Sequence, residues 1–512
     1  MMSNTNTNFL DYVWWEETES IEDIKAQIAE GADPNVKDSF GETLLMFEAR
    51  FNNNPEVLEM LVELGADINE KNNNGCTILM LAAGDNENPE VIKTLIELGT
   101  VVDATDDEGE TALMFAAHSN KNPEIIRTLV ELGADINKKD NKGCTSLMYA
   151  ARYNENPEVI KTLVELGANV NEKDNEGWTP LTYIVENGKK TDFVKIIIEQ
   201  GIAINAIDNN GWTPLMFAAR YNNNPEVIKT LIELGAVINA ADDEGWTPLM
   251  FAARYNENPE IARILIKLGA NVNAKKDNNV TSLMLAAAGN NPEVIRTLIE
   301  LGADVNAKSN DGWTPLVYVA RFNENPKVVK TLVELGADVN AKCNWDRTPL
   351  MYVAENSKNP EFVKILIEQG ADVNAKDNNG RTPLMCAVIW LENFDVIRTL
   401  IELGANINEK DNYGITPLML AAEYNGDADV VRMLVEFGAD VNANDNSGQT
   451  PLMKAVENNN LEVINTLIKF GADVIAKDNS GKTIFDYAKE NNEQKIAEFL
   501  QKIIQEKTKD NI

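Results

Sequence analysis

Apolar residues form two short clusters that alternate with polar segments along the whole chain. In residues 213–221, Leu215, Ala218 and Ala219 follow the i, i+3, i+4 spacing of one helical face. Residues 225–234 carry apolar side chains on two faces of a second helix. A helix with two apolar faces packs on its own partner and on neighbouring units. The pattern therefore predicts pairs of short helices that stack on one another.

Both predicted helices have recognisable ends. Thr213 is a good N-cap, and Pro214 suits the first helical position because no hydrogen bond is lost there. Asn224 and Pro225 repeat this arrangement at the second helix. Gly235 is the residue type that closes a helix in the left-handed conformation. A polar turn then leads to the next threonine.

The threonine that caps the first helix marks a repeat. Successive threonines are 34 residues apart, except for two steps of 33 residues. The positions are Thr43, Thr77, Thr111, Thr145, Thr179, Thr213, Thr247, Thr281, Thr314, Thr348, Thr382, Thr416, Thr450 and Thr483. Glycine lies two residues before the threonine in 12 of these 14 units, and Asn279 and Asp346 replace it in the others. Since these residue types best tolerate positive φ, the sequence predicts that backbone conformation in every such turn.

The segments 213–219 and 231–236, with Asn239 and Ala240, resemble the ankyrin repeat. The resemblance extends from about Ser20 to Ile503. It implies an all-α fold, an ankyrin-repeat solenoid of stacked helix–turn–helix units with projecting turns or short hairpins. The family has histidine after Thr-Pro-Leu, where this chain has methionine in 11 units. That histidine often braces the turn in the family, so other residues are expected to brace it here.

The resemblance also implies a division of the chain. Residues 1–36 are predicted to form an N-terminal capping helix pair, and residues 37–478 the tandem repeats. Residues 479–503 resemble a C-terminal capping repeat, and residues 504–512 form a polar tail. Caps are expected because the terminal units of a solenoid must turn a polar face to water.

Net charge restricts the classes of partner. The chain has 46 basic and 81 acidic side chains, a formal net charge of −35, which disfavours direct binding to nucleic acid or anionic membrane. No apolar stretch approaches the roughly 20 residues of a membrane span. The N-terminal segment lacks the basic start of a Sec-type signal peptide. We therefore expect a cytoplasmic monomer, while export as an effector through another signal stays open.

The residues that usually carry catalysis or bind metals are scarce. The only histidine is His118, and the cysteines are Cys76, Cys144, Cys343 and Cys386, with no CxxC pair. We expect four reduced thiols, no metal site and no cofactor. Paired carboxylates recur in nearly every turn, which favours charged turns over a unique acid–base site. The sequence therefore predicts a protein that is not an enzyme.

In the ankyrin family, the turn tips and the exposed side of the first helix line a concave groove where partners usually bind. The resemblance places in that groove the residue before each capping threonine and the last two residues of each first helix. Aromatic and arginine side chains gather at these positions, and we call this set the Arg/aromatic band. The band comprises Arg152, Tyr153, Trp178, Trp212, Arg220, Tyr221, Trp246, Arg254, Tyr255, Trp313, Arg321 and Phe322.

Trp, Tyr and Arg are the residue types that most often anchor interfaces. The leading hypothesis is a scaffold or adaptor that binds another protein through the Arg/aromatic band. For any single residue, a structural role in cation–π ladders between units weighs about equally. A second hypothesis, an acidic decoy that mimics nucleic acid and occupies a nucleic-acid-binding enzyme, rests on the net charge of −35.

Overall fold

The computed structural model shows helices joined by turns with almost no strands among the described residues, as the all-α prediction required. It describes residues 21–188, 191–323, 325–389, 394–490 and 494–509. The first 20 residues of the predicted N-terminal cap lie outside this part of the chain.

The chain forms two compact units. The first comprises Met1–Phe251 with Lys267–Ala270, and the second comprises Ala252–Ile266 with Asn271–Ile512. The division falls within α15 (Pro248–Tyr255) and α16 (Pro259–Lys267).

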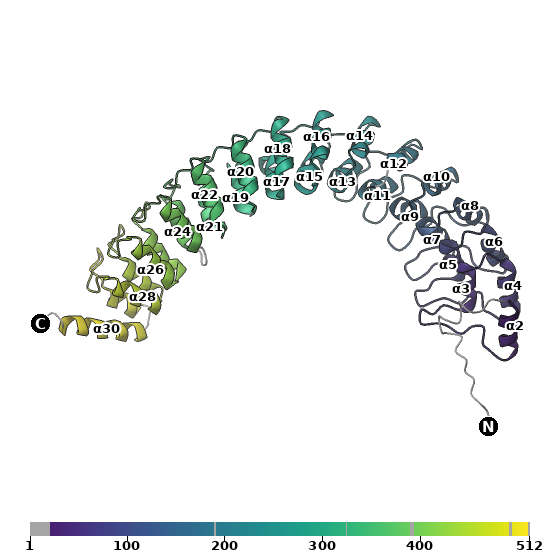
Figure 1. Cartoon of the computed structure of the whole chain (residues 1–512), viewed down its shortest axis with the longest axis horizontal. Coiled ribbons are helices and arrows are strands. Elements are labelled where there is room, and N and C mark those ends of the chain that lie inside the picture. Colours follow the sequence, from purple (N-terminus) through teal and green to yellow (C-terminus); the bar gives the residue numbers. More distant parts are fainter. Residues whose placement is uncertain (1–20, 189–190, 324, 390–393, 491–493, 510–512) are drawn as a thin grey trace, which may run out of the picture. The chain divides into compact units, whose positions relative to one another are not determined.

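The first unit is a row of helix pairs that follow one another in chain order (Figure 1). First helices pack on first helices of the next pair, and second helices on second helices. Its helices are α2 (Ile21–Ala29), α3 (Leu44–Phe51), α4 (Pro55–Glu63), α5 (Ile78–Asp85), α6 (Pro89–Glu97), α7 (Ala112–Ser119), α8 (Pro123–Glu131), α9 (Ser146–Tyr153), α10 (Pro157–Glu165), α11 (Pro180–Glu186), α12 (Thr191–Ile198), α13 (Pro214–Tyr221) and α14 (Pro225–Glu233).

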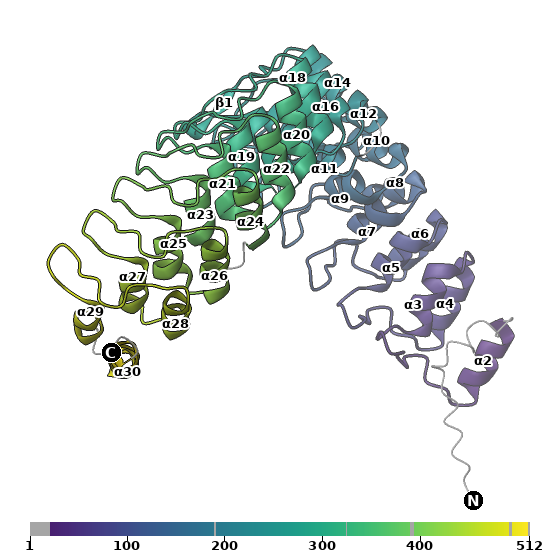
Figure 2. The same cartoon turned by 60° about the vertical axis from the view of Figure 1, so that its left-hand side comes forward.

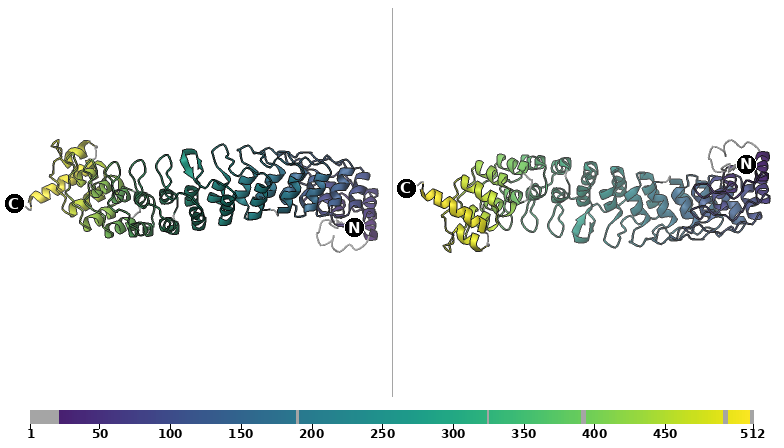
Figure 3. Two further views of the ribbon diagram at one scale, coloured as in Figure 1. Left: turned by 90° about the horizontal axis from the view of Figure 1, so that it is seen from above. Right: turned by 90° about the horizontal axis from the view of Figure 1, so that it is seen from below.

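The second unit repeats this arrangement, and its long turns project beyond the first helices (Figure 2). A two-stranded hairpin, β1 (Lys275–Lys276) with β2 (Val280–Thr281), encloses η1 (Asp277–Asn279) and appears as teal arrows in Figure 3. The helices are α17 (Ser282–Gly289), α18 (Pro292–Glu300), α19 (Pro315–Phe322), α20 (Pro326–Glu334), α21 (Pro349–Asn356), α22 (Pro360–Glu368), α23 (Pro383–Ile389), α24 (Phe394–Glu402), α25 (Pro417–Leu420), the π-helix η2 (Ala421–Asn425), α26 (Ala428–Glu436), α27 (Pro451–Glu457), α28 (Leu461–Lys469), α29 (Ile484–Glu490) and α30 (Gln494–Lys509).

The predicted helix ends are confirmed. Thr213 Oγ1 accepts the N–H of Met216 at 3.4 Å, and Asn224 Oδ1 accepts the N–H of Glu226 at 3.1 Å. Gly235 has φ 105°. The two residues that replace glycine before the threonine also have positive φ, 58° at Asn279 and 57° at Asp346. At the C-terminus, α30 continues past residue 503, where the sequence placed the end of the last cap.

The turns are braced by two groups that stand in for the family's histidine. The N–H of Thr213 donates to the sulfur of Met216, which lies three residues on, at 3.3 Å. An aspartate at the start of most loops accepts backbone N–H groups. Asp174 Oδ1, for example, accepts those of Glu176 and Trp178 at 2.9 and 2.8 Å. The recurring turn carboxylates are therefore structural as well as charged.

Buried asparagines connect successive repeats. Asn120 Nδ2 donates to the carbonyls of Ala83 and Asn86, at 2.9 and 2.8 Å, in the preceding repeat. Asn154 makes the same two bonds to Ala117 and Asn120, at 3.0 and 2.8 Å. These bonds satisfy carbonyls at the end of the first helix that have no partner within the helix. We call this set the asparagine ladder; its members include Asn86, Asn120, Asn154, Asn222 and Asn323.

The turn tips form a second ladder on the surface. Asn141 Nδ2 donates to the carbonyl of Asp107 at 3.2 Å, Asn175 to that of Asn141 at 3.1 Å, and Asn209 to that of Asn175 at 2.9 Å. The N–H of Asn175 also donates to the carbonyl of Lys142 at 3.0 Å. These bonds bring each turn into close contact with the next, and most turns have glycine at the point of closest approach, as at Gly143.

The asparagine ladder is interrupted in one repeat of the first unit, and we expect that repeat to open first. Gly188 occupies the ladder position and has no side chain to donate. Because stability in such arrays is approximately local, amides of α11 and α12 should exchange before those of α7 and α8. Hydrogen exchange followed by mass spectrometry measures this directly. Equal protection of the two repeats would contradict a stabilising role for the ladder.

All four cysteines are free thiols, as predicted from the sequence. Cys76, Cys343 and Cys386 are buried, and Cys144 is half-buried. Burial raises the pKa of Cys76 and of Cys386 to about 11, so both thiols stay protonated at neutral pH.

Candidate interaction surface

In some repeats an arginine side chain brings together the two ends of the first helix. Trp212 lies just before the N-cap of α13, and Arg220 lies in its last turn. Long helical side chains point back toward the N-terminus. The Arg220 guanidinium accordingly lies 5.2 Å from the ring centroid of Trp212 and 4.9 Å from that of Tyr221. The three band residues of this repeat thus form one stacked group.

The tryptophans pack between repeats. Trp178 contacts Phe217 of the next repeat, with ring centroids 4.8 Å apart, and Trp212 contacts Phe251 in the same way at 4.5 Å. Trp212 also contacts Phe217 within its own repeat, at 5.3 Å. Both tryptophans are half-buried. These contacts stabilise the stacking of repeats and support a structural role for the tryptophans.

The outer aromatic residues of the Arg/aromatic band are different. Tyr153 and Tyr221 are each 45% exposed, Tyr255 is 44% exposed and Phe322 is 54% exposed. Arg152 lies over the ring of Tyr153, with its guanidinium carbon 5.2 Å from the centroid. Exposed aromatic rings paired with arginine are typical of residues that anchor interfaces.

Residues of the Arg/aromatic band occur in both units, each described by itself. In the second unit, Arg254 donates to the carbonyl of Ala288 at 2.9 Å and lies 5.5 Å from the ring of Tyr255. Arg321 lies 4.9 Å from the ring of Trp313 and 5.6 Å from that of Phe322. The stacked group of tryptophan, arginine and outer ring found in the first unit therefore recurs in the second.

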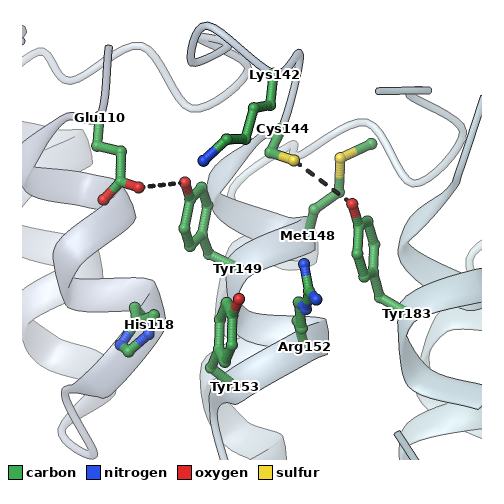
Figure 4. Close-up of a pocket in the computed structure, with 9 residues that line it drawn as sticks. All are labelled: Glu110, His118, Lys142, Cys144, Met148, Tyr149, Arg152, Tyr153 and Tyr183. Carbon is green, nitrogen blue, oxygen red and sulfur yellow. Dashed lines mark hydrogen bonds between the residues drawn. The ribbon is translucent and has the colours of Figure 1, made fainter. Parts of the chain in front are cut away.

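A pocket of about 180 Å³ lies beside Arg152 and Tyr153, in the first unit (Figure 4). The Tyr149 hydroxyl is 2.6 Å from Glu110 Oε1 and 2.7 Å from Asp140 Oδ2. Burial, together with the hydrogen bonds to these carboxylates, raises the pKa of Tyr149 above its ordinary range. Tyr149 is therefore a neutral hydroxyl that links two turns, rather than an activated nucleophile.

His118 is exposed, but it is not an isolated surface residue. Its ring lies 4.4 Å from that of Tyr153 in the next repeat. Burial lowers the pKa of His118, although Glu110 opposes the shift. The sequence did not reveal this contact, because His118 occupies a position that is arginine in other repeats, such as Arg220.

A larger pocket of about 520 Å³ lies in the second unit. Its lining includes Trp313 and Arg321 of the Arg/aromatic band. It also includes Arg347 and Arg381, which the sequence did not single out. Both arginines occupy the position before the capping threonine, where earlier repeats have tryptophan.

Two further features bear on the kind of site. Across the described ranges, no three His, Cys, Asp or Glu side chains are grouped to hold a metal ion. The helices of the same ranges include none with the length and apolar character needed to span a bilayer.

Family models match this chain over nearly its whole length. The model described as ankyrin repeats (3 copies) matches residues 16–106, 79–174, 147–242, 222–309, 249–343, 316–411 and 418–510. The model described as ankyrin repeats (many copies) matches residues 391–435. No curated protein matches the sequence. The helix pairs, the capping threonines and these matches together show that the chain belongs to the ankyrin-repeat family.

Proposed function

We propose that this chain is a scaffold or adaptor that binds another protein through its Arg/aromatic band. Ankyrin repeats are generally protein–protein interaction modules. The observation that carries the proposal is the pairing of exposed rings, such as Tyr221 and Phe322, with arginines that the half-buried tryptophans hold in place. Side chains ordered before binding lose less entropy when a partner docks.

The proposed site is the groove that this family uses, formed by turn tips and first helices. The proposed setting is the cytoplasm, with the chain a monomer that has no direct contact with nucleic acid. Four free thiols support a reducing compartment. The residues with potential for acid–base or nucleophilic chemistry also support a binding role. The one histidine packs against the ring of Tyr153, and the nearby Tyr149 hydroxyl is neutral.

The test begins with a pull-down from the native cell and continues with affinities for the retained protein. Tyr221→Ala and Phe322→Ala remove exposed rings with little loss of packing. Each should weaken binding by about 2 kcal/mol, roughly thirtyfold, and leave thermal unfolding nearly unchanged. Calorimetric titration gives the affinity, and circular dichroism gives the melting curve.

The matched control is Lys229→Ala with Glu233→Ala on α14. These side chains are 4.0 Å apart and largely exposed, so their loss should change affinity by less than about 1 kcal/mol. Normal binding by both ring variants would reject the Arg/aromatic band as the interface. Binding that instead depends on acidic residues and disappears at moderate salt would favour the nucleic-acid mimic.

A further inference from the structure

Arginine side chains converge on the 520 Å³ pocket of the second unit. The residue before the capping threonine is Trp313, Arg347 and Arg381 in three successive repeats. All three line the pocket, together with Arg321 from the end of α19. Three arginines therefore line one pocket, together with the two carboxylates of Glu355 and Asp377, in a chain whose formal net charge is −35.

Arg347 is only partly neutralised. One of its terminal nitrogens bonds Glu355 Oε2 and lies 3.8 Å from the sulfur of Cys386. Its guanidinium carbon is 4.4 Å from the ring centroid of Tyr352. Its Nε is buried and has no hydrogen-bond acceptor among the described residues.

Arg381 has less compensation than Arg347. In the described part of the chain it has no carboxylate within ion-pair distance, and its Nε is also buried without an acceptor, whereas Arg321 is exposed to water. By contrast, Arg50 near the N-terminus bonds Asp85 at 2.7 Å and Glu42 at 2.8 Å. Arg347 and Arg381 therefore each carry a buried N–H group without the acceptors that Arg50 has.

Buried N–H donors without acceptors are costly, and bringing like charges together adds to the cost. A bound anion removes both costs, and planar guanidinium groups suit the bidentate geometry of phosphate oxygens. The pocket is larger than an oxyanion needs, since its volume falls in the range of about 300–1,000 Å³ that holds small organic ligands. Its other walls include the aromatic rings of Trp313, Trp345 and Tyr352.

We propose that this pocket binds an aryl phosphate, with Arg381, Arg347 and Arg321 around the phosphate and the aromatic walls around the ring. The aryl phosphate could be a phosphotyrosine side chain of a partner protein. In that case the proposal rests on the proposed function, because Trp313 and Arg321 belong to the Arg/aromatic band. A free aryl phosphate is the other source of the same chemistry.

Calorimetric titration of the full chain with phenyl phosphate at low ionic strength tests the proposal without a partner. Arg381→Gln should weaken binding at least about tenfold, because it removes charge-assisted hydrogen bonds. Arg381→Lys keeps the charge without the planar fork and should lose affinity to an intermediate extent. The control is Arg398→Gln, the same change of charge on an exposed position of α24, which should bind as the native chain does.

Inorganic phosphate should bind more weakly than phenyl phosphate, since it cannot contact the aromatic walls. Equal binding of the two ligands, no saturable binding, or an equal loss in Arg398→Gln would each overturn the proposal. Phosphotyrosine with blocked amino and carboxyl groups distinguishes a phosphotyrosine side chain of a partner from a free aryl phosphate. Binding at least as tight as that of phenyl phosphate supports a protein ligand, and tenfold weaker binding supports a free aryl phosphate. If phenyl phosphate does not bind, the aryl phosphate proposal fails, and the Tyr221→Ala and Phe322→Ala variants still test the proposed function.

Discussion

Replacing Asn120 by alanine is expected to destabilise the repeats around it by about 4 kcal/mol. The side chain is buried and donates to two carbonyls of the preceding repeat, those of Ala83 and Asn86. Each buried carbonyl that loses its donor costs about 1–3 kcal/mol. Asn120 Oδ1 also accepts the N–H of Asn122 at 2.9 Å, so the start of α8 loses support as well.

Urea-dependent hydrogen exchange of amides in α5 and α7 measures this loss, because unfolding of a repeat array is regional rather than two-state. The comparison variant is Asn141→Ala, which removes one exposed bond between turn tips, to the carbonyl of Asp107. It should cost less than about 1 kcal/mol. If the two variants lose equal stability, the buried ladder does not hold the repeats together.

Gly143→Ala is expected to cost about 3 kcal/mol, for two separable reasons. Gly143 has φ 81°, where an L-residue is strained by about 1–2 kcal/mol. A Cβ there would also lie 2.7 Å from Asn175 Oδ1 and 2.9 Å from the Asn175 nitrogen. The next turn would have to move away, which breaks the bond from the Asn175 N–H to the Lys142 carbonyl.

Gly133→Ala separates these two contributions. Gly133 has φ 100°, but a Cβ at this position has no atom within 4 Å. Only the backbone strain of about 1–2 kcal/mol applies there. The losses of stability that hydrogen exchange measures for the two variants should therefore differ by the free-energy cost of separating the turns. A Gly133→Ala variant as unstable as Gly143→Ala would show that backbone strain alone requires the glycine.

The local structure was predictable because each signal acts within a few residues. The cap at Thr213, the proline after it and the positive φ at Asn279 and Asp346 depend only on neighbours along the chain. The fixed spacing then determined that helix pairs would stack. The N–H to sulfur contact at Met216 was not foreseen, because the sequence showed only that methionine replaces the family's histidine.

The surface was less predictable, because its chemistry depends on residues one repeat apart. The sequence marked Trp313 and Arg321 but missed Arg347 and Arg381, whose position before the threonine had been associated with tryptophan. The sequence also did not separate the half-buried Trp212 from the exposed Tyr221. That difference depends on Phe251, which the next repeat places against the indole.

The spacing of the two asparagine ladders bears on how this chain changes its length. Asn120 and its acceptor Asn86 are 34 residues apart, and so are Asn175 and its acceptor Asn141. Recombination that adds or excises a whole repeat brings an equivalent donor to an equivalent acceptor, so the new junction is bonded like every other junction. A repeat that is one residue shorter is also tolerated, since Asn479 donates to the carbonyl of Asn446, 33 residues away, at 3.1 Å. The bonds that stabilise the stack therefore favour length variation by whole or nearly whole repeats.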